Sequence, residues 1–330
     1  MIHKFHIPVL GLSFSIDSPI KVAQYGISSA VSIVDDQLTE RLRQYHSKLH
    51  QLPFIGIGIK EFDARARRLT AYLDMMQDII DQQIETLKSA AFSASESLHQ
   101  YFKLLPDSNP AYKLYQKFIH TTDDSQKDVL ESTLKTMIQA GKIDVNIMSK
   151  VDKVNRDEEG RALESIYSDA TAALRGYTNS KINSSLVLSA GMNPKLYNYL
   201  AELPHFLPNV DGTFTKKVCL KVSDYRSANI QAKYLAKKGI WVSEFRVESG
   251  LNCGGHAFAT EGFLLGPILE EFKQNHKLLI DDLFSLYANA LQAKNITLQQ
   301  APQLVITAQG GVGTGEEQRF LLEYYQLNSI

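Results

Sequence analysis

The chain has 330 residues, of which 44% are hydrophobic, and a formal net charge of −1. This length suits one large α/β domain with an added segment, or two domains. The near-zero charge argues against a nucleic-acid binder that works through a broad basic face, and no apolar stretch approaches the ~20 residues of a membrane-spanning helix. The two cysteines form neither a disulfide framework nor a zinc-ligand spacing, so no metal site is predicted and the cytoplasm is the expected location.

Apolar runs alternate with helical patterns along the chain, which predicts βαβ units around a parallel sheet. The runs occupy residues 6–11, 29–34, 142–148, 185–189, 218–222, 240–247 and 304–307. Helices are expected after the first two runs, at 20–25 and 36–46, and after the last run, at 316–325. Short runs that are apolar on both faces are typical of parallel strands covered by helices, so we predict seven such strands.

A long helical segment separates the second and third strands. Apolar residues at helical spacing predict one amphipathic helix over 63–88, and a further helix is expected over 125–140, with Gly141 as its stop. The cluster Arg65, Arg67 and Arg68 is interpreted as a solvated helix face, although it would also suit an anionic ligand.

These elements divide the chain into three parts. Residues 1–50 hold the first two strands, 51–141 form a helical insertion that acts as a cap or an interface, and 142–330 hold strands three to seven.

The most informative motif follows the sixth strand. The motif ends with Gly254, Gly255 and His256. Glycines without a Cβ let a planar ligand approach the backbone closely. Histidine, with an ordinary pKa of ~6.5, exchanges a proton near neutral pH. This motif is therefore a candidate ligand site with a titratable group beside it.

A second motif, 308–315, lies between the seventh strand and the last helix and contains four glycines. A glycine-rich turn before a helix presents backbone N–H groups and the positive end of the helix dipole, so it predicts a phosphate cradle. The alternative is a turn whose glycines only permit tight packing.

Together these segments resemble the flavin-binding TIM barrels of the nitronate monooxygenase (2-nitropropane dioxygenase) family, which are similar to the flavin-dependent enoyl-acyl-carrier-protein reductases. The matching segments are 7–11, 143–147, 250–256 and 309–313. The resemblance implies a bound FMN and makes His256 the catalytic base. It also implies a set of cofactor-binding residues: Gly11, Asn146, Asn252, Gly254, Gly255, Gly310, Gly311 and Gly313.

Two residues depart from the family pattern. Asn252 stands where the family has glutamate, which removes a negative charge beside the flavin and adds an amide donor, and Cys253 replaces an alanine. Lys221, near the end of the fifth strand, is a further candidate for contact with the flavin or an anionic substrate, and a solvated amine is the alternative.

The family's eighth strand, with a second phosphate-binding turn, has no counterpart before residue 330. We therefore expect a (β/α)8 TIM-type barrel that lacks its last unit, with two unpaired parallel edges, and we expect the chain to be a fragment.

The function predicted from the sequence is that of an FMN-dependent oxidoreductase with a small-molecule substrate and no nucleic-acid or membrane partner. A homo-oligomer and a C-terminal continuation of the same protein remain open as partners. One alternative is a flavin-free barrel that holds a phosphorylated ligand at the turn Gly310–Gly315. Another is an inactive scaffold that binds a partner through the helical insertion.

Overall fold

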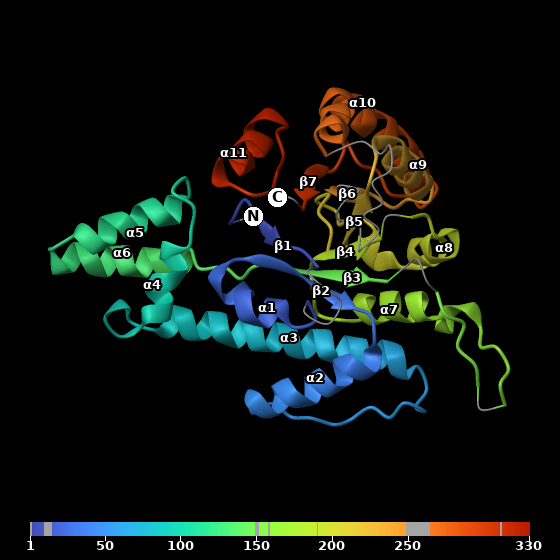
Figure 1. Ribbon diagram of the computed structural model, residues 1–330, viewed down its shortest axis with the longest axis horizontal. Coiled ribbons are helices and arrows are strands. Elements are labelled where there is room, and N and C mark those ends of the chain that lie inside the picture. Colours follow the sequence, from blue (N-terminus) through green and yellow to red (C-terminus); the bar gives the residue numbers. More distant parts are fainter. Residues whose placement is uncertain are drawn as a thin grey trace.

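The computed structural model describes residues 2–9, 15–148, 152–157, 159–189, 191–248, 265–310 and 312–330. In this part of the chain, seven parallel strands form one curled sheet in sequence order (Figure 1). The strands are β1 (His6–Ile7), β2 (Ser28–Ile33), β3 (Ile143–Ile147), β4 (Ser185–Leu188), β5 (Lys217–Val222), β6 (Val242–Glu248) and β7 (Val305–Gln309). This parallel order confirms the α/β class and gives a TIM-barrel-like fold.

Helices surround the curled sheet. They are α1 (Ser18–Val22), α2 (Asp36–Leu49), α3 (Ala64–Ser89), α4 (Glu96–Lys103), α5 (Pro110–His120), α6 (Asp124–Thr136), α7 (Asp169–Thr178), α8 (Pro194–Glu202), α9 (Tyr225–Ala236), α10 (Leu265–Gln292) and α11 (Gly315–Tyr324). The expected helices near 20–25, 36–46, 63–88 and 316–325 are thus confirmed, the first as α1 followed by a 3-10 turn. Within the described residues, no helix is both long enough and apolar enough to span a membrane.

The two faces of the sheet differ in polarity. Phe245 of β6 faces outward, where its ring packs against Phe272 of α10. Its neighbour Arg246 faces the barrel interior and reaches Asp144 of β3, which is not an adjacent strand. The expectation that the strands are apolar on both faces is therefore wrong. Because side chains alternate along a strand, each outward apolar residue is followed by an inward residue, and most of those are polar.

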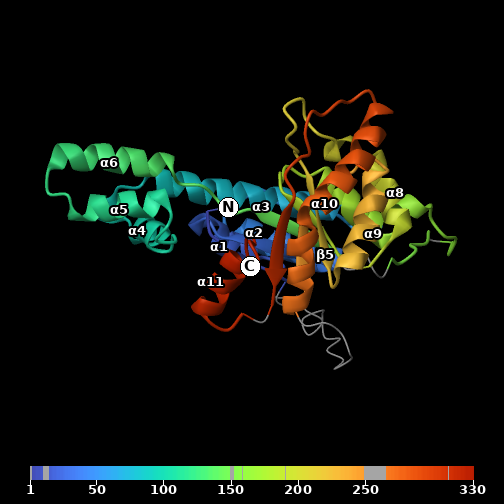
Figure 2. The same cartoon turned by 90° about the horizontal axis from the view of Figure 1, so that it is seen from above.

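The insertion between β2 and β3 has two structural parts. Its first helix, α3, joins the layer around the sheet and packs against α1, α2 and α7. Gly176 allows the contact with α7, because a Cβ there would lie 2.8 Å from the carbonyl oxygen of Ala66. The remaining helices, α4 to α6, extend beyond the end of α3, away from the sheet (Figure 2).

The projecting helices rejoin the sheet at the amino end of β3. The helix α6 ends at Thr136, earlier than expected, and Gly141 lies in the connection to β3. A Cβ at Gly141 would lie 1.9 Å from the carbonyl oxygen of Ile27, so this residue serves close backbone packing rather than helix termination. The attachment places α4–α6 on the side of the molecule away from the carboxyl ends of the strands.

The gap between β7 and β1 contains the segment Asn328–Ile330. Its Ser329 forms a parallel bridge with Thr307 of β7. On the other side, the His6 N–H donates to the Ile330 carbonyl over 2.9 Å, and the Ile330 N–H donates to the Lys4 carbonyl over 3.2 Å. The expectation of two unpaired edges is therefore wrong. The segment lies where an eighth strand would lie, although the described residues form no eighth ladder that closes the barrel.

Candidate functional site

Six predicted site residues lie outside the residues that the structure describes. They are Gly11, Asn252, Gly254, Gly255, His256 and Gly311. The structure does place Asn146, Lys221, Gly310 and Gly313, all at or near the carboxyl ends of strands. Barrel enzymes build their sites at this end, so these four residues define the candidate site.

Asn146 lies on the inner face of β3 and is only 7% exposed. It pairs in register with Ser32 of β2, and its Nδ2 donates to the Ser32 hydroxyl over a long 3.4 Å. The Asn146 Oδ1 has no hydrogen-bond partner among the described residues. A buried carbonyl oxygen without a donor costs free energy, so this atom is suited to receive a hydrogen bond from a ligand.

Lys221 is joined to β6 and β7 through two residues that sequence reasoning missed. Its Nζ lies 3.1 Å from Oε1 of Glu248, the last residue of β6. The same oxygen accepts a 2.6 Å hydrogen bond from Nε2 of Gln309, the last residue of β7. The solvated amine is thus excluded, because Lys221 pairs with a buried carboxylate and its side chain is 18% exposed. Their signal in the sequence was their position, because Glu248 and Gln309 are the polar residues that follow the apolar runs of β6 and β7.

The glycine turn after β7 has a geometry that only glycine adopts readily, since Gly310 has a φ of 97°. The turn lines a pocket of about 430 Å³ beside β1. Its amide groups are partly used within the chain, because the Gly313 N–H donates to Oε2 of Glu317 over 2.8 Å. Thr314 caps the same helix by accepting from the Glu317 N–H. A phosphate at this turn would therefore have to displace the Glu317 carboxylate.

Deeper in the barrel, a buried charge cluster joins β3, β6 and β7. The Arg246 guanidinium donates to Glu244 at 2.8 Å and to Asp144 at 2.9 Å, and Thr307 donates to Glu244 at 2.6 Å. Burial raises the pKa of Asp144. Burial also acts to raise the pKa of Glu244, but Arg246 outweighs it, so that pKa is lowered. Arg246 thus favours the ionised form of Glu244.

His6 borders this cluster from β1. Burial, with a further contribution from the Arg246 charge, lowers the pKa of His6 to about 3. The imidazole is therefore neutral at physiological pH and adds no charge to the barrel interior.

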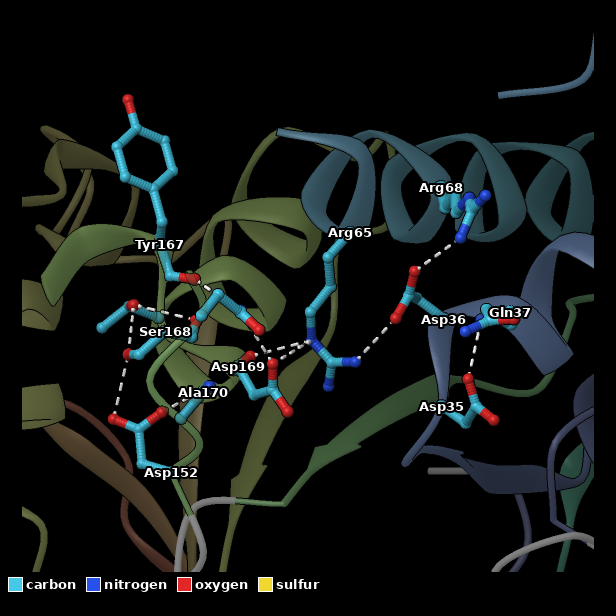
Figure 3. Close-up of polar contacts among 12 residues, drawn as sticks. Asp35, Asp36, Gln37, Arg65, Arg68, Asp152, Tyr167, Ser168, Asp169 and Ala170 are labelled. Atoms are coloured by element: carbon cyan, nitrogen blue, oxygen red, sulfur yellow. Dashed lines mark hydrogen bonds and ion pairs between the residues drawn. The ribbon is translucent and has the colours of Figure 1, made fainter. Parts of the chain in front are cut away.

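The arginines at the start of α3 lie outside the barrel, close to the amino ends of α2 and α7 (Figure 3). Arg65 and Arg68 each bind one oxygen of Asp36, at 3.0 and 2.9 Å. Arg68 is 5% exposed and also donates to the Ile57 carbonyl. The interpretation as a solvated face is therefore wrong for these two residues, and it is confirmed for Arg67, whose side chain is 50% exposed and pairs with Glu61.

Within the described ranges, no group of three or more histidine, cysteine, aspartate or glutamate side chains is arranged to hold a metal ion. Comparison with known proteins finds no matching family model and no matching curated protein.

Proposed function

We propose that this chain is an FMN-dependent oxidoreductase, nitronate-monooxygenase-like in mechanism, with its site at the carboxyl ends of the strands. The observation that supports this most is the buried, unpartnered Oδ1 of Asn146 on the inner face of the barrel. It fits the imide N–H of an isoalloxazine ring, a hydrogen-bond donor that a carbonyl oxygen would recognise.

The other described residues fit a flavin in part. Lys221 supplies a cation for the electron-rich edge of the ring. Glu248, which accepts a hydrogen bond from Gln309, holds its ammonium group in position. The phosphate end fits less well, because Glu317 already accepts from the Gly313 amide. FMN binding would require the Glu317 side chain to turn away from the amino end of α11, because its carboxylate competes with the phosphate group there.

When bound, FMN supplies the redox chemistry, while the protein supplies binding, orientation and electrostatics. In this proposal His256 takes a proton from a carbon acid or gives one to an electron-poor alkene, a role typically worth ~10²–10⁴-fold in rate. Asn146 and Lys221 orient the ring, and the buried side chains around them exclude water from its inner edge.

The test is binding of FMN to the purified chain, followed by the flavin's visible absorbance and fluorescence. Asn146→Leu should weaken FMN about tenfold or more, the effect of one lost buried hydrogen bond. Asn198→Leu is the matched control, because Asn198 is exposed on α8. Glu317→Gln should tighten FMN without tightening riboflavin, which lacks the phosphate. No FMN binding by either the parent chain or Glu317→Gln would reject the proposal.

The pocket beside the glycine turn also suits the flavin-free alternative, a barrel that binds a phosphorylated ligand. In that case inorganic phosphate would compete with FMN completely, and riboflavin would not bind at all. Under the flavin proposal, riboflavin binds more weakly than FMN but still depends on Asn146.

A further inference from the structure

The amino ends of the strands enclose a second polar pocket, of about 340 Å³, at the end of the barrel opposite the glycine turn. The first residues of five strands line it: His6, Ser28, Ser185, Lys217 and Val305. Its volume lies at the lower end of the range for small-molecule sites.

Two buried polar atoms in this pocket lack a partner among the described residues. They are Nε2 of His6 and Oγ of Ser243, in residues that are 7% and 9% exposed. Buried polar atoms are nearly always hydrogen-bonded, and leaving one unpaired is costly. Both residues line the pocket, so a group bound there would satisfy them.

A bulge in β6 shapes this wall. Val218 pairs with Val242, but the next residue, Cys219, pairs with Glu244, so Ser243 is the extra residue. Bulges redirect a side chain and are common beside binding sites. As a result, both Ser243 and Glu244 line the pocket, although a regular strand would point them to opposite faces.

The charge at the pocket mouth is positive. Lys142, just before β3, and Lys217, the first residue of β5, both line it. Neither ammonium group forms a direct ion pair in the described part of the chain, and Asp144, which also lines the pocket, attracts both at longer range. Burial lowers the pKa of Lys217, and repulsion by Lys142 adds to the effect. Deeper in the pocket, Arg246 is already paired with Asp144 and Glu244. An anion between the two lysines would relieve their repulsion.

We propose that this amino-end pocket binds a small oxyanion, the carboxylate or phosphate group of a metabolite, between Lys142 and Lys217, with Ser243 and His6 as hydrogen-bonding partners. The site does not depend on the proposed flavin function, which uses the other end of the strands.

The experiment is lysine acetylation of the full chain, with the modification of each lysine measured by mass spectrometry in the presence of inorganic phosphate or of acetate. Lys142 and Lys217 should be protected several-fold and saturably. Lys113 and Lys277, both exposed, serve as internal controls. Protection by phosphate alone or by acetate alone identifies which oxyanion the site takes. Phosphate bound at the glycine turn would protect neither lysine.

Two variants connect the protection to the pocket. Ser243→Ala should weaken anion-dependent protection of Lys217 about tenfold, since a hydrogen bond to a charged group is lost. Lys142→Ala changes an exposed residue, so it should preserve the fold and weaken the same protection. Ser223→Ala, at the opposite end of β5, is the control. Absence of protection by both anions, or equal protection of Lys113 and Lys277, would overturn the proposal.

Discussion

The two faces of the sheet differ in the kind of side chain they bury, and adjacent residues of β6 show the contrast. Phe245 packs among apolar side chains outside the barrel, whereas Arg246 is enclosed within it beside Asp144 and Glu244. Barrel interiors of this type are usually filled by branched apolar residues. Here the outer face supplies the hydrophobic stabilisation, and the inner face carries charges that must compensate one another.

Such an interior is difficult to explain by stability alone. A buried ion pair seldom stabilises a fold more than apolar residues of the same volume would, because desolvation offsets the attraction. The cluster around Arg246 is therefore not expected to stabilise the fold more than apolar side chains would. Removing a single charge should therefore destabilise the fold more than removing the whole cluster, and this difference can be measured.

The largest effect is expected from Arg246→Met. It leaves the Glu244 carboxylate buried without its cation, which should lower the free energy of unfolding by about 3–5 kcal/mol in urea denaturation. The triple variant Asp144→Asn, Glu244→Gln, Arg246→Met should recover much of this loss, because no uncompensated charge remains. If the triple variant is as unstable as the single one, the cluster acts through packing and not through charge.

On the outer face, the free energy of unfolding should depend on side-chain volume instead of charge. Leu220 of β5 is fully buried and pairs in register with Phe245. Leu220→Ala should cost about 2–5 kcal/mol of unfolding free energy, through lost burial and the cavity left behind. Leu278, which is 61% exposed on α10, is the control position and should tolerate the same change. A similar loss at both positions would contradict the assignment of Leu220 to the core.

The sequence predicted the strand positions well, because each apolar run contains the outward residues of one strand. The run 304–307 corresponds to β7, and the run 142–148 contains β3. It did not predict the polar interior, although Glu244, Arg246 and Glu248 alternate with apolar residues at a period of two. Treating the whole run as apolar hid that period.

Contacts between residues far apart in the chain could not be predicted from the sequence, for a different reason. Nothing local indicates that Ser329 bridges β7, or that Arg68 of α3 pairs with Asp36 of α2. These contacts depend on how distant segments meet in three dimensions. At the candidate site, Lys221 was identified from its place at a strand end, but Glu248 and Gln309 were recognised only from their contacts with one another.

The inner face should also make stability depend on pH. The pKa of His6 is about 3 in the folded chain, against an ordinary value of 6.5. The unfolded chain therefore binds a proton below pH 6.5 that the folded chain does not, and stability falls as the pH is lowered from 6.5 toward 3. At pH 5 the contribution is a loss of about 2 kcal/mol relative to neutral pH. His6→Gln should flatten this part of the stability profile, and an unchanged slope would show that other groups cause it.

The smallest effect is expected outside the barrel, where two adjacent arginines of α3 differ in environment. Arg67 pairs with Glu61 while half exposed, so Arg67→Ala should change stability by about 0–1 kcal/mol, and less at high salt. Arg68 is buried between Asp36 and the Ile57 carbonyl, so Arg68→Ala removes several charge-assisted hydrogen bonds and should cost about 2–3 kcal/mol or more. Thermal denaturation at low and high salt measures both variants. Equal costs for the two would mean that burial adds little to the strength of the Arg68–Asp36 pair.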